Sequence, residues 1–271
     1  MSVDPMNQPA LFARDTLITP LIMLINNGVP ITTFIDVGAA DGSFALTILD
    51  AVNPNLHTLC IDAQETYAPS LARIESILGE PYRISAVGDH DGMIRVNRPE
   101  HEYWLSTAAH MNTPDRTLEL PCRKLDGLRQ ESGLNGPYFI KLDVEGAEMG
   151  VLRGAEDTIR DASGLLIESP VRSAPGPQFL EIYEFLAARD FSLFDIVRLS
   201  HRGSDSTLYQ FYSVFIANRF DFRGKAPLRS KTQQAEVLAA VTGRRDQLRA
   251  ENVQLIASIK LKRAMLSGSA P

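Results

Sequence analysis

Charged side chains gather in an apolar setting in the run IKLDVEGAE at positions 140–148. Because side chains alternate along a strand, Lys141 and Asp143 lie on the same side of the strand that this run predicts, at its carboxyl end. Glu145 follows in a turn, and Glu148 falls in the first turn of the next helix, where the helix dipole stabilises a carboxylate. Capping explains part of the pattern, but Lys141 and Asp143 are costly to bury without partners. The run therefore indicates either a structural Lys–Asp pair or a site for acid–base chemistry.

A second chemical feature is the glycine loop GAADG at positions 38–42, which follows an apolar segment and precedes a predicted helix. A strand, a glycine loop and a helix form the general nucleotide-binding device of open α/β sheets, with the ligand beyond the carboxyl ends of the strands. The loop lacks the GxGxxG spacing of dinucleotide sites. Asp36 and Asp41 would repel a pyrophosphate and favour a ligand with a cationic group, such as S-adenosylmethionine. The structural alternative is an ordinary strand–turn–helix corner in which Asp41 caps the helix.

Two further strand ends carry residues suited to an adenosyl ligand. Asp62 closes the second predicted strand, where a carboxylate accepts hydrogen bonds from ribose hydroxyls. Both NAD and S-adenosylmethionine carry a ribose, so Asp62 does not discriminate between them. The small residues Ala86 and Val87 would let an adenine lie flat against the backbone, although a plain strand-to-turn junction accounts for them equally well. The predicted cofactor-binding residues are Asp36, Gly38, Ala39, Asp41, Ser43, Asp62, Ala63, Ala86, Val87 and Asp143.

The elements that must position these residues follow from hydrophobic periodicity. Short apolar strands alternate with helices, a pattern typical of βαβ units and of a parallel sheet with helices on both faces. The stretch 94–106 is less regular than its surroundings and is expected to hold either short antiparallel pieces or a loop. Helices are predicted over 10–25, 43–51, 67–78, 124–131, 148–160 and 179–189. Strands are predicted over 31–37, 57–61, 82–87, 118–122, 138–144, 164–168, 191–197 and 208–217.

The composition changes near the carboxyl end of the chain, which predicts a domain over 1–218 with a helical segment at 1–30, a linker over 219–230 and a long helix over 231–266. In that helix, apolar residues recur at alternating spacings of three and four, as in a short heptad array. Asn252 at a seam position favours a paired coiled coil, and hence a homo-oligomer, whereas Arg245 and Lys262 in the seam argue against it. A terminal helix packed on its own domain or solvated is the alternative.

Charge and composition narrow the classes of protein that the chain can belong to. The net charge of −6 argues weakly against a general nucleic-acid binder. Cys60 and Cys122 lack the spacing of a zinc site and suit buried thiols in a reducing compartment. The amino-terminal segment has no basic region before its apolar stretch, and no run reaches the roughly 20 apolar residues of a membrane span. The simplest placement is cytoplasmic.

Several segments together resemble the FkbM family of methyltransferases: FIDVGA at 34–39, AVGD at 86–89, IKLDVEGAE at 140–148, VLRGA at 151–155 and the stretch 120–128. The resemblance covers about Ile31 to Glu168. It implies a Rossmann-like class I methyltransferase fold, with a seven-stranded mostly parallel sheet and helices on both faces. It also implies S-adenosylmethionine as cofactor and O-methylation, often of sugars in glycans or natural products. The family usually has Glu-Pro where this chain has Asp62-Ala63, and the carboxyl-terminal helical tail is not part of its pattern.

The resemblance also suggests roles for the charged residues. Glu145 or Asp143 is the predicted base, with the other orienting substrate or cofactor, and Lys141 would lower the pKa of a neighbouring carboxylate or hold the acceptor oxygen. His110 is a second candidate base, with a surface histidine as its alternative. The catalytic candidates are therefore Asp143, Glu145, Lys141, Glu148 and His110. Oxygen ligands on Asp143, Glu145 and Glu168 are compatible with a divalent metal such as Mg²⁺, but nothing in the spacing indicates one.

Other functions remain open at this point. One is a nicotinamide-dependent oxidoreductase, which shares the general cofactor architecture. Another is a catalytically silent binding or scaffold protein that acts through its helical tail. The tail could also set assembly, either as an oligomer or by docking to a glycosyltransferase. The acceptor is a small molecule or glycan whose identity the sequence does not reveal. Tyr103 and Trp104 could stack on a sugar ring or could simply pack.

Overall fold

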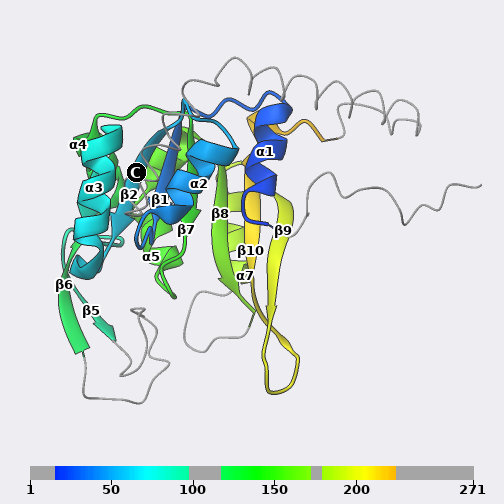
Figure 1. Ribbon diagram of the computed structural model, residues 1–271. Helices are drawn as coiled ribbons and strands as arrows, with labels where there is room; N and C mark the ends of the chain where they lie inside the picture. The colour runs from blue at the N-terminus through cyan, green and yellow to red at the C-terminus, as the bar shows by residue number, and fades with distance from the viewer. Residues whose placement is uncertain (1–15, 98–116, 172–178, 224–271) are drawn as a thin grey trace, which may run out of the picture.

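The computed structural model describes residues 16–97, 117–171 and 179–223. Its centre is a seven-stranded sheet with the order β3-β2-β1-β7-β8-β10-β9 (Figure 1). Strand β10 is antiparallel to both of its neighbours, and the other adjacent pairs are parallel. The predicted mostly parallel sheet is confirmed. The strands are β1 (Thr33–Val37), β2 (His57–Asp62), β3 (Tyr82–Ile84), β7 (Tyr138–Leu142), β8 (Ala162–Pro170), β9 (Phe191–His201) and β10 (Leu208–Ala217).

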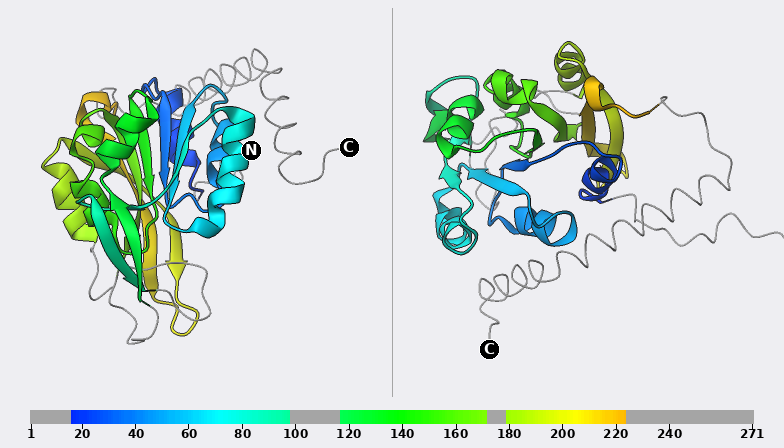
Figure 2. Two further views of the ribbon diagram at one scale, coloured as in Figure 1. Left: turned by 90° about the vertical axis from the view of Figure 1, so that its left-hand side faces the viewer. Right: turned by 90° about the horizontal axis from the view of Figure 1, so that it is seen from above.

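Helices cover both faces of this sheet (Figure 2). One face carries α1 (Thr19–Asn26), α2 (Ser43–Ala51) and α3 (Ala68–Leu78), and the other carries α4 (Leu125–Ser132), α5 (Glu148–Arg153), α6 (Glu156–Arg160) and α7 (Phe179–Ala187). Consecutive residues of a strand enter opposite cores, as Phe34 and Ile35 do. Each fully buried side chain of this size contributes about 1.5–3 kcal/mol. The chain also has two short 3₁₀ helices, η1 (Glu65–Tyr67) and η2 (Asn218–Phe220).

The predicted strand over 82–87 is divided between two sheets. After β3, Ser85 interrupts the ladder, and its hydroxyl donates to the carbonyls of Ala86 and Pro121. The chain continues as β4 (Ala86–Val87) in a second sheet of order β4-β6-β5, with β5 (Gly92–Asn97) and β6 (Thr117–Arg123). The stretch 94–106 was expected to hold short antiparallel pieces or a loop. Strand β5 is antiparallel to β6, which confirms the first alternative up to residue 97, and the rest of that stretch lies outside the described residues.

The single helix predicted over 148–160 is also wrong, because the chain breaks between α5 and α6. Asp126 starts the second helix, since its carboxylate accepts hydrogen bonds from the backbone N–H groups of Asp157 at 3.1 Å and Thr158 at 2.8 Å. These are donors that a helix start leaves without an intrahelical partner. At the break, Gly154 packs directly on the backbone of Gly88.

Replacing Gly154 with alanine is expected to lower the free energy of unfolding by about 1–3 kcal/mol, because the new Cβ would overlap the carbonyl oxygen of Gly88. Gly150 is the matched control, since a Cβ there would come no closer than 3.8 Å to Gly88. Gly150→Ala should be neutral or slightly stabilising, because alanine favours a helix. Urea denaturation of both variants checks this, and equal effects would contradict the close approach at Gly154.

Some of the predicted organisation lies outside the described residues. This applies to the first part of the helix predicted over 10–25, because the described residues begin at 16; the helix itself begins at Thr19. It also applies to His110, Tyr103 and Trp104, and to the helix predicted over 231–266. Among the helices that are described, none has the length and apolar character needed to span a membrane.

Candidate functional site

A cavity of about 240 Å³ opens at the carboxyl ends of β1, β2 and β7. This is where an open α/β sheet binds its ligand. Six of the predicted cofactor residues line it: Gly38, Asp62, Ala63, Ala86, Val87 and Asp143. The sequence did not point to Tyr67 or Gln64, nor to Ile94 and Val96 of β5, which also line it. Those four residues lie in or next to η1 and on the second sheet. The pattern of strands in the sequence does not predict where these elements lie.

The loop after β1 needs glycine because it passes directly over the chain that leaves β7. Gly38 has φ +80°, and a Cβ at this position would overlap the carbonyl of Asp143. The backbone N–H of Asp143 donates to the carbonyl of Val37 at 3.0 Å, which joins the two strand ends. The glycine loop and the charged run therefore meet at one place.

Asp62 shapes the wall of the cavity. Its carboxylate accepts hydrogen bonds from the backbone N–H of Ala40 and of Gln64, each at 2.8 Å. Burial raises the pKa of Asp62, and these two hydrogen bonds offset only part of that effect. Each carboxylate oxygen has a second lone pair. Asp62 can therefore support the loop and still accept a hydrogen bond from a ligand hydroxyl.

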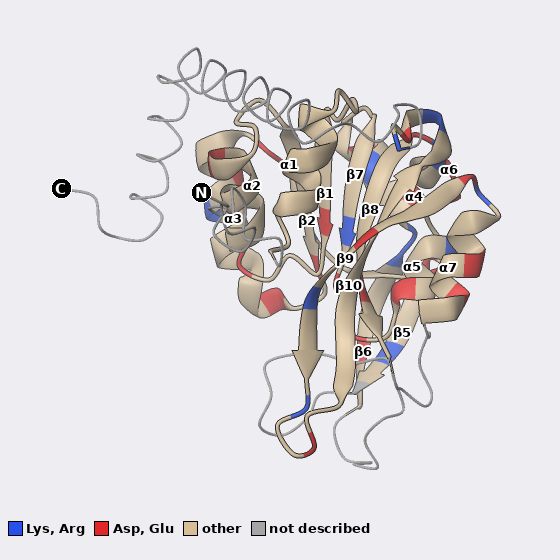
Figure 3. Ribbon diagram, turned by 90° about the vertical axis from the view of Figure 1, so that its right-hand side faces the viewer, with Lys and Arg blue, Asp and Glu red and all other residues tan. Residues whose placement is uncertain are grey.

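Asp36 was predicted near the ligand, but it lies beneath the loop, fully buried and away from the cavity lining. Its Oδ1 contacts Lys141 Nζ at 3.0 Å, and the same ammonium reaches Asp143 Oδ2 at 3.3 Å. Figure 3 shows acidic and basic segments next to each other in the central strands. Burial alone lowers the pKa of Lys141, but Asp36 and Asp143 outweigh it and raise that pKa above its ordinary value. Lys141 is therefore charged and buried between two carboxylates.

Other predicted cofactor residues also lie away from the cavity lining. Asp41 is exposed, and its Oδ1 accepts the backbone N–H of Ser43 at 3.0 Å. This hydrogen bond spans two residues and forms an Asx turn within the loop. The N-cap of α2 is Gly42 and no side chain caps the helix, so the alternative in which Asp41 caps it is wrong. Ala39 is buried in the core against α1 and α2, and Ser43 is the first residue of α2. A carboxylate where the first strand meets its loop therefore does not by itself predict contact with the ligand.

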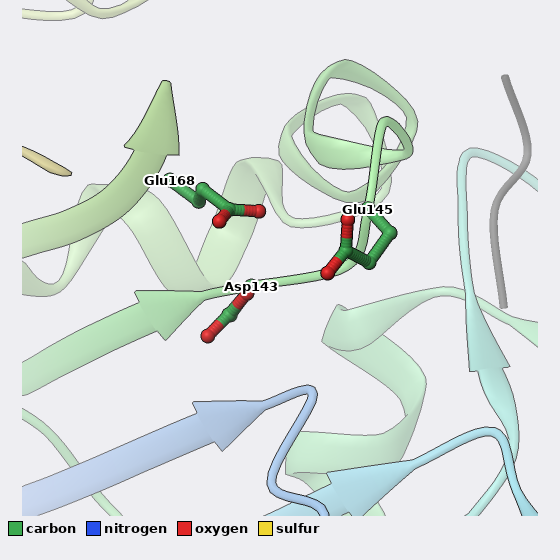
Figure 4. Close-up of side chains that lie close together, drawn as sticks. All are labelled: Asp143, Glu145 and Glu168. Atoms are coloured by element: carbon green, nitrogen blue, oxygen red, sulfur yellow. The ribbon is translucent and has the colours of Figure 1, made fainter. Parts of the chain in front are cut away.

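Three carboxyl groups converge beside the cavity: those of Asp143, Glu145 and Glu168 (Figure 4). They come from the end of β7, from the turn before α5 and from β8, and one oxygen of each lies within 4.8 Å of one oxygen of each of the others. Glu168 Oε1 accepts a hydrogen bond from Gln210 Nε2 at 2.7 Å. Burial, followed by the charges of the neighbouring carboxylates, raises the pKa of Glu168 to about 9. The carboxyl of Glu168 therefore keeps its proton at neutral pH.

Glu148 supports the turn and is absent from the cavity lining. It is buried, and its Oε1 accepts the backbone N–H of Gly146 at 3.1 Å, while its Oε2 has no hydrogen-bond partner among the described residues. Burial raises the pKa of Glu148 to about 7. Glu145 in the same turn has φ +51°, a strained value for a residue other than glycine. The turn thus holds Glu145 at the cavity at some conformational cost.

Tyr212 and Gln210 were not predicted as site residues. The Tyr212 hydroxyl donates to Asp143 Oδ2 at 2.9 Å. Both residues lie on the antiparallel strand β10, in register with β8, where Tyr212 faces Glu168. The alternation along 208–217 identified the strand, but its pairing partner and register are set by tertiary packing.

Comparison with known proteins agrees with this geometry. A family model described as the methyltransferase FkbM domain matches residues 36–193 of the 271-residue chain. No match was found among curated proteins.

Solved structures that match this chain include three methyltransferases. Magnesium protoporphyrin IX methyltransferase from Synechocystis PCC 6803, with bound SAM, is 14% identical, with coverage of 73% of this chain and 77% of that chain and a TM-score of 0.39. Precorrin-6y C5,15-methyltransferase from Geobacter metallireducens GS-15 is 10% identical. The match covers 72% of this chain and 85% of that chain, with a TM-score of 0.40. A SAM-dependent methyltransferase from Aquifex aeolicus is 16% identical. The match covers 78% of this chain and 95% of that chain, with a TM-score of 0.35.

Proposed function

The chain belongs to the FkbM family of S-adenosylmethionine-dependent methyltransferases, and we propose that it methylates a hydroxyl group on a sugar, glycan or natural product. The observation that carries this proposal is the group of carboxyl side chains beside the cofactor cavity. Asp143 and Glu145 line the cavity, and Glu168 adjoins them. Planar polar side chains of this kind bind hydroxyl groups, and a carboxylate can remove a hydroxyl proton.

The cavity suits S-adenosylmethionine in its charge and its shape. Asp62 lies where a carboxylate accepts hydrogen bonds from ribose hydroxyls. Ala86 and Val87 offer a narrow apolar wall for the adenine. Asp143 supplies negative charge for the cationic end of the cofactor, which carries an ammonium and a sulfonium.

The reaction needs an acceptor oxygen in line with the methyl–sulfur bond. The oxygen attacks the methyl carbon, the carbon–sulfur bond breaks with its electron pair on sulfur, and the hydroxyl proton goes to a base. Asp143 Oδ2 already contacts Lys141 Nζ and accepts a hydrogen bond from the Tyr212 hydroxyl, so this oxygen is engaged by the protein. Glu168 holds a proton of its own at neutral pH. We therefore assign the base to Glu145 and the orienting role to Asp143.

Asp62→Asn is expected to weaken binding of S-adenosylhomocysteine about 10–100-fold, because a hydrogen bond to a charged group contributes about 1.5–3 kcal/mol. Titration calorimetry measures this, with NAD titrated in parallel. Asp157→Asn is a matched control, since Asp157 is exposed on α6. Tight binding of NAD with no binding of S-adenosylhomocysteine would instead support a nicotinamide-dependent oxidoreductase.

The acceptor atom needs a separate experiment. Mass spectrometry of glycans and lipids from cells with and without the enzyme should reveal a product heavier by one methyl group. Fragmentation should place that group on an oxygen. A methyl group on carbon or nitrogen would overturn O-methylation while leaving the family assignment intact. Cofactor binding without any methylated product would favour a catalytically silent protein.

A further inference from the structure

Strand β10 carries two polar side chains that reach the carboxyl group cluster of Asp143, Glu145 and Glu168. Gln210 and Tyr212 are two residues apart, so they lie on the same face of the strand. Gln210 Nε2 donates to Glu168 at 2.7 Å, and the Tyr212 hydroxyl donates to Asp143 at 2.9 Å. Tyr212 thus reaches across the neighbouring strand β8 to a residue that follows β7. This ties the antiparallel part of the sheet to the cavity formed by the parallel part.

The hydrogen bond from Tyr212 falls on the oxygen of Asp143 that also faces Lys141. Lys141 Nζ is 3.3 Å from this Oδ2, but it lies closer to Asp36, at 3.0 Å, and also donates to the carbonyl of Gly38 at 3.2 Å. Lys141 is therefore shared among three acceptors and by itself holds Asp143 loosely. With Tyr212 present, two donors from different strands fix one oxygen of the carboxylate, which sets the direction of the other.

We propose that Tyr212 is a positioning residue that orients the Asp143 carboxylate toward the bound cofactor. This rests on the proposed function, because its purpose is to align the methyl donor with the acceptor. Tyr212 is well suited to the task because it is buried and its ring has few alternative positions. Burial, followed by the charges of Asp143 and Glu168, raises the pKa of Tyr212, so the hydroxyl remains a donor at neutral pH.

Tyr212→Phe removes the hydroxyl and leaves the ring in place. We expect kcat for methyl transfer to fall about 10–100-fold, because a small misplacement of a reacting group is costly in rate. The dissociation constant for S-adenosylhomocysteine should change less than about threefold, since Asp143 keeps its charge and Lys141. Tyr138→Phe is the matched control: Tyr138 is also buried, and its hydroxyl donates to the carbonyl of Leu134 at 3.1 Å, away from the cavity. Its kcat should remain near that of the wild type.

A double-mutant cycle shows whether Tyr212 acts through Asp143. If it does, Tyr212→Phe should lower kcat strongly in the wild-type chain and hardly at all in an Asp143→Ala background. Equal effects in the two backgrounds, or an unchanged kcat in Tyr212→Phe, would overturn the proposal while wild-type turnover still supports the proposed function. Absence of wild-type turnover and of S-adenosylhomocysteine binding would instead mark failure of the proposed function, and the positioning role would fall with it.

Discussion

Glu145→Gln is expected to lower kcat about 10²–10⁴-fold, the contribution typical of a general base. Glutamine has nearly the same shape as glutamate and keeps the turn before α5, but it cannot accept the hydroxyl proton. The dissociation constant for S-adenosylhomocysteine should stay within about threefold of the wild-type value. Initial rates of transfer from labelled S-adenosylmethionine measure the first quantity, and calorimetry measures the second.

A surface substitution provides the control for Glu145. Glu75 is an exposed residue of α3, and Glu75→Gln should retain wild-type kcat. Asp143→Asn should affect both cofactor binding and turnover, because Asp143 is assigned to orientation rather than to proton transfer. If Glu145→Gln kept full turnover and Asp143→Asn lost it without weaker binding, the two roles would have to be exchanged.

Lys141→Met is expected to lower the free energy of unfolding by about 3–5 kcal/mol, because removal of one partner leaves a buried charge without compensation. Asp36 has no exposed surface, and Lys141 is its ion-pair partner. Urea denaturation measures the loss. A second substitution, Asp36→Leu, should restore much of the stability, because a buried ion pair can be exchanged for apolar side chains at little cost.

The pH dependence of this variant provides a further check. Burial raises the pKa of Asp36, and in Lys141→Met no ammonium offsets that effect. The folded state then binds a proton more readily than the unfolded state, so stability should increase as the pH falls. A loss below about 1 kcal/mol, or a loss that does not shrink at lower pH, would show that Lys141 does not hold Asp36 in this way.

Much of the architecture follows from the sequence alone. Consecutive apolar residues such as Phe34 and Ile35 enter opposite cores, which is typical of a central parallel strand buried on both faces. The alternation of such strands with helices then favours a sheet covered on both sides. The break at Gly154 was not predictable in the same way, because it depends on contact with Gly88, far away in the chain.

The sequence predicted those site residues that lie at the ends of strands or shortly after them. Asp62 is the last residue of β2, and Asp143 and Glu145 lie within three residues after β7. All three line the cavity. Asp36 has the same kind of sequence setting, but its side chain turns beneath the loop toward Lys141. Tyr212 enters from an antiparallel strand whose register the local pattern leaves open. Residues that contact the cluster from a strand distant in the sequence can therefore be identified only in the structure.

The central claim is that this chain transfers a methyl group from S-adenosylmethionine by means of the carboxylates beside the cavity. The most direct measurement is transfer of a deuterated methyl group from the cofactor to a panel of hydroxyl-bearing acceptors, followed by mass spectrometry. The wild-type chain should yield a labelled O-methyl product, and Glu145→Gln and Asp143→Asn should yield far less in the same time. Full turnover in both variants would contradict the account.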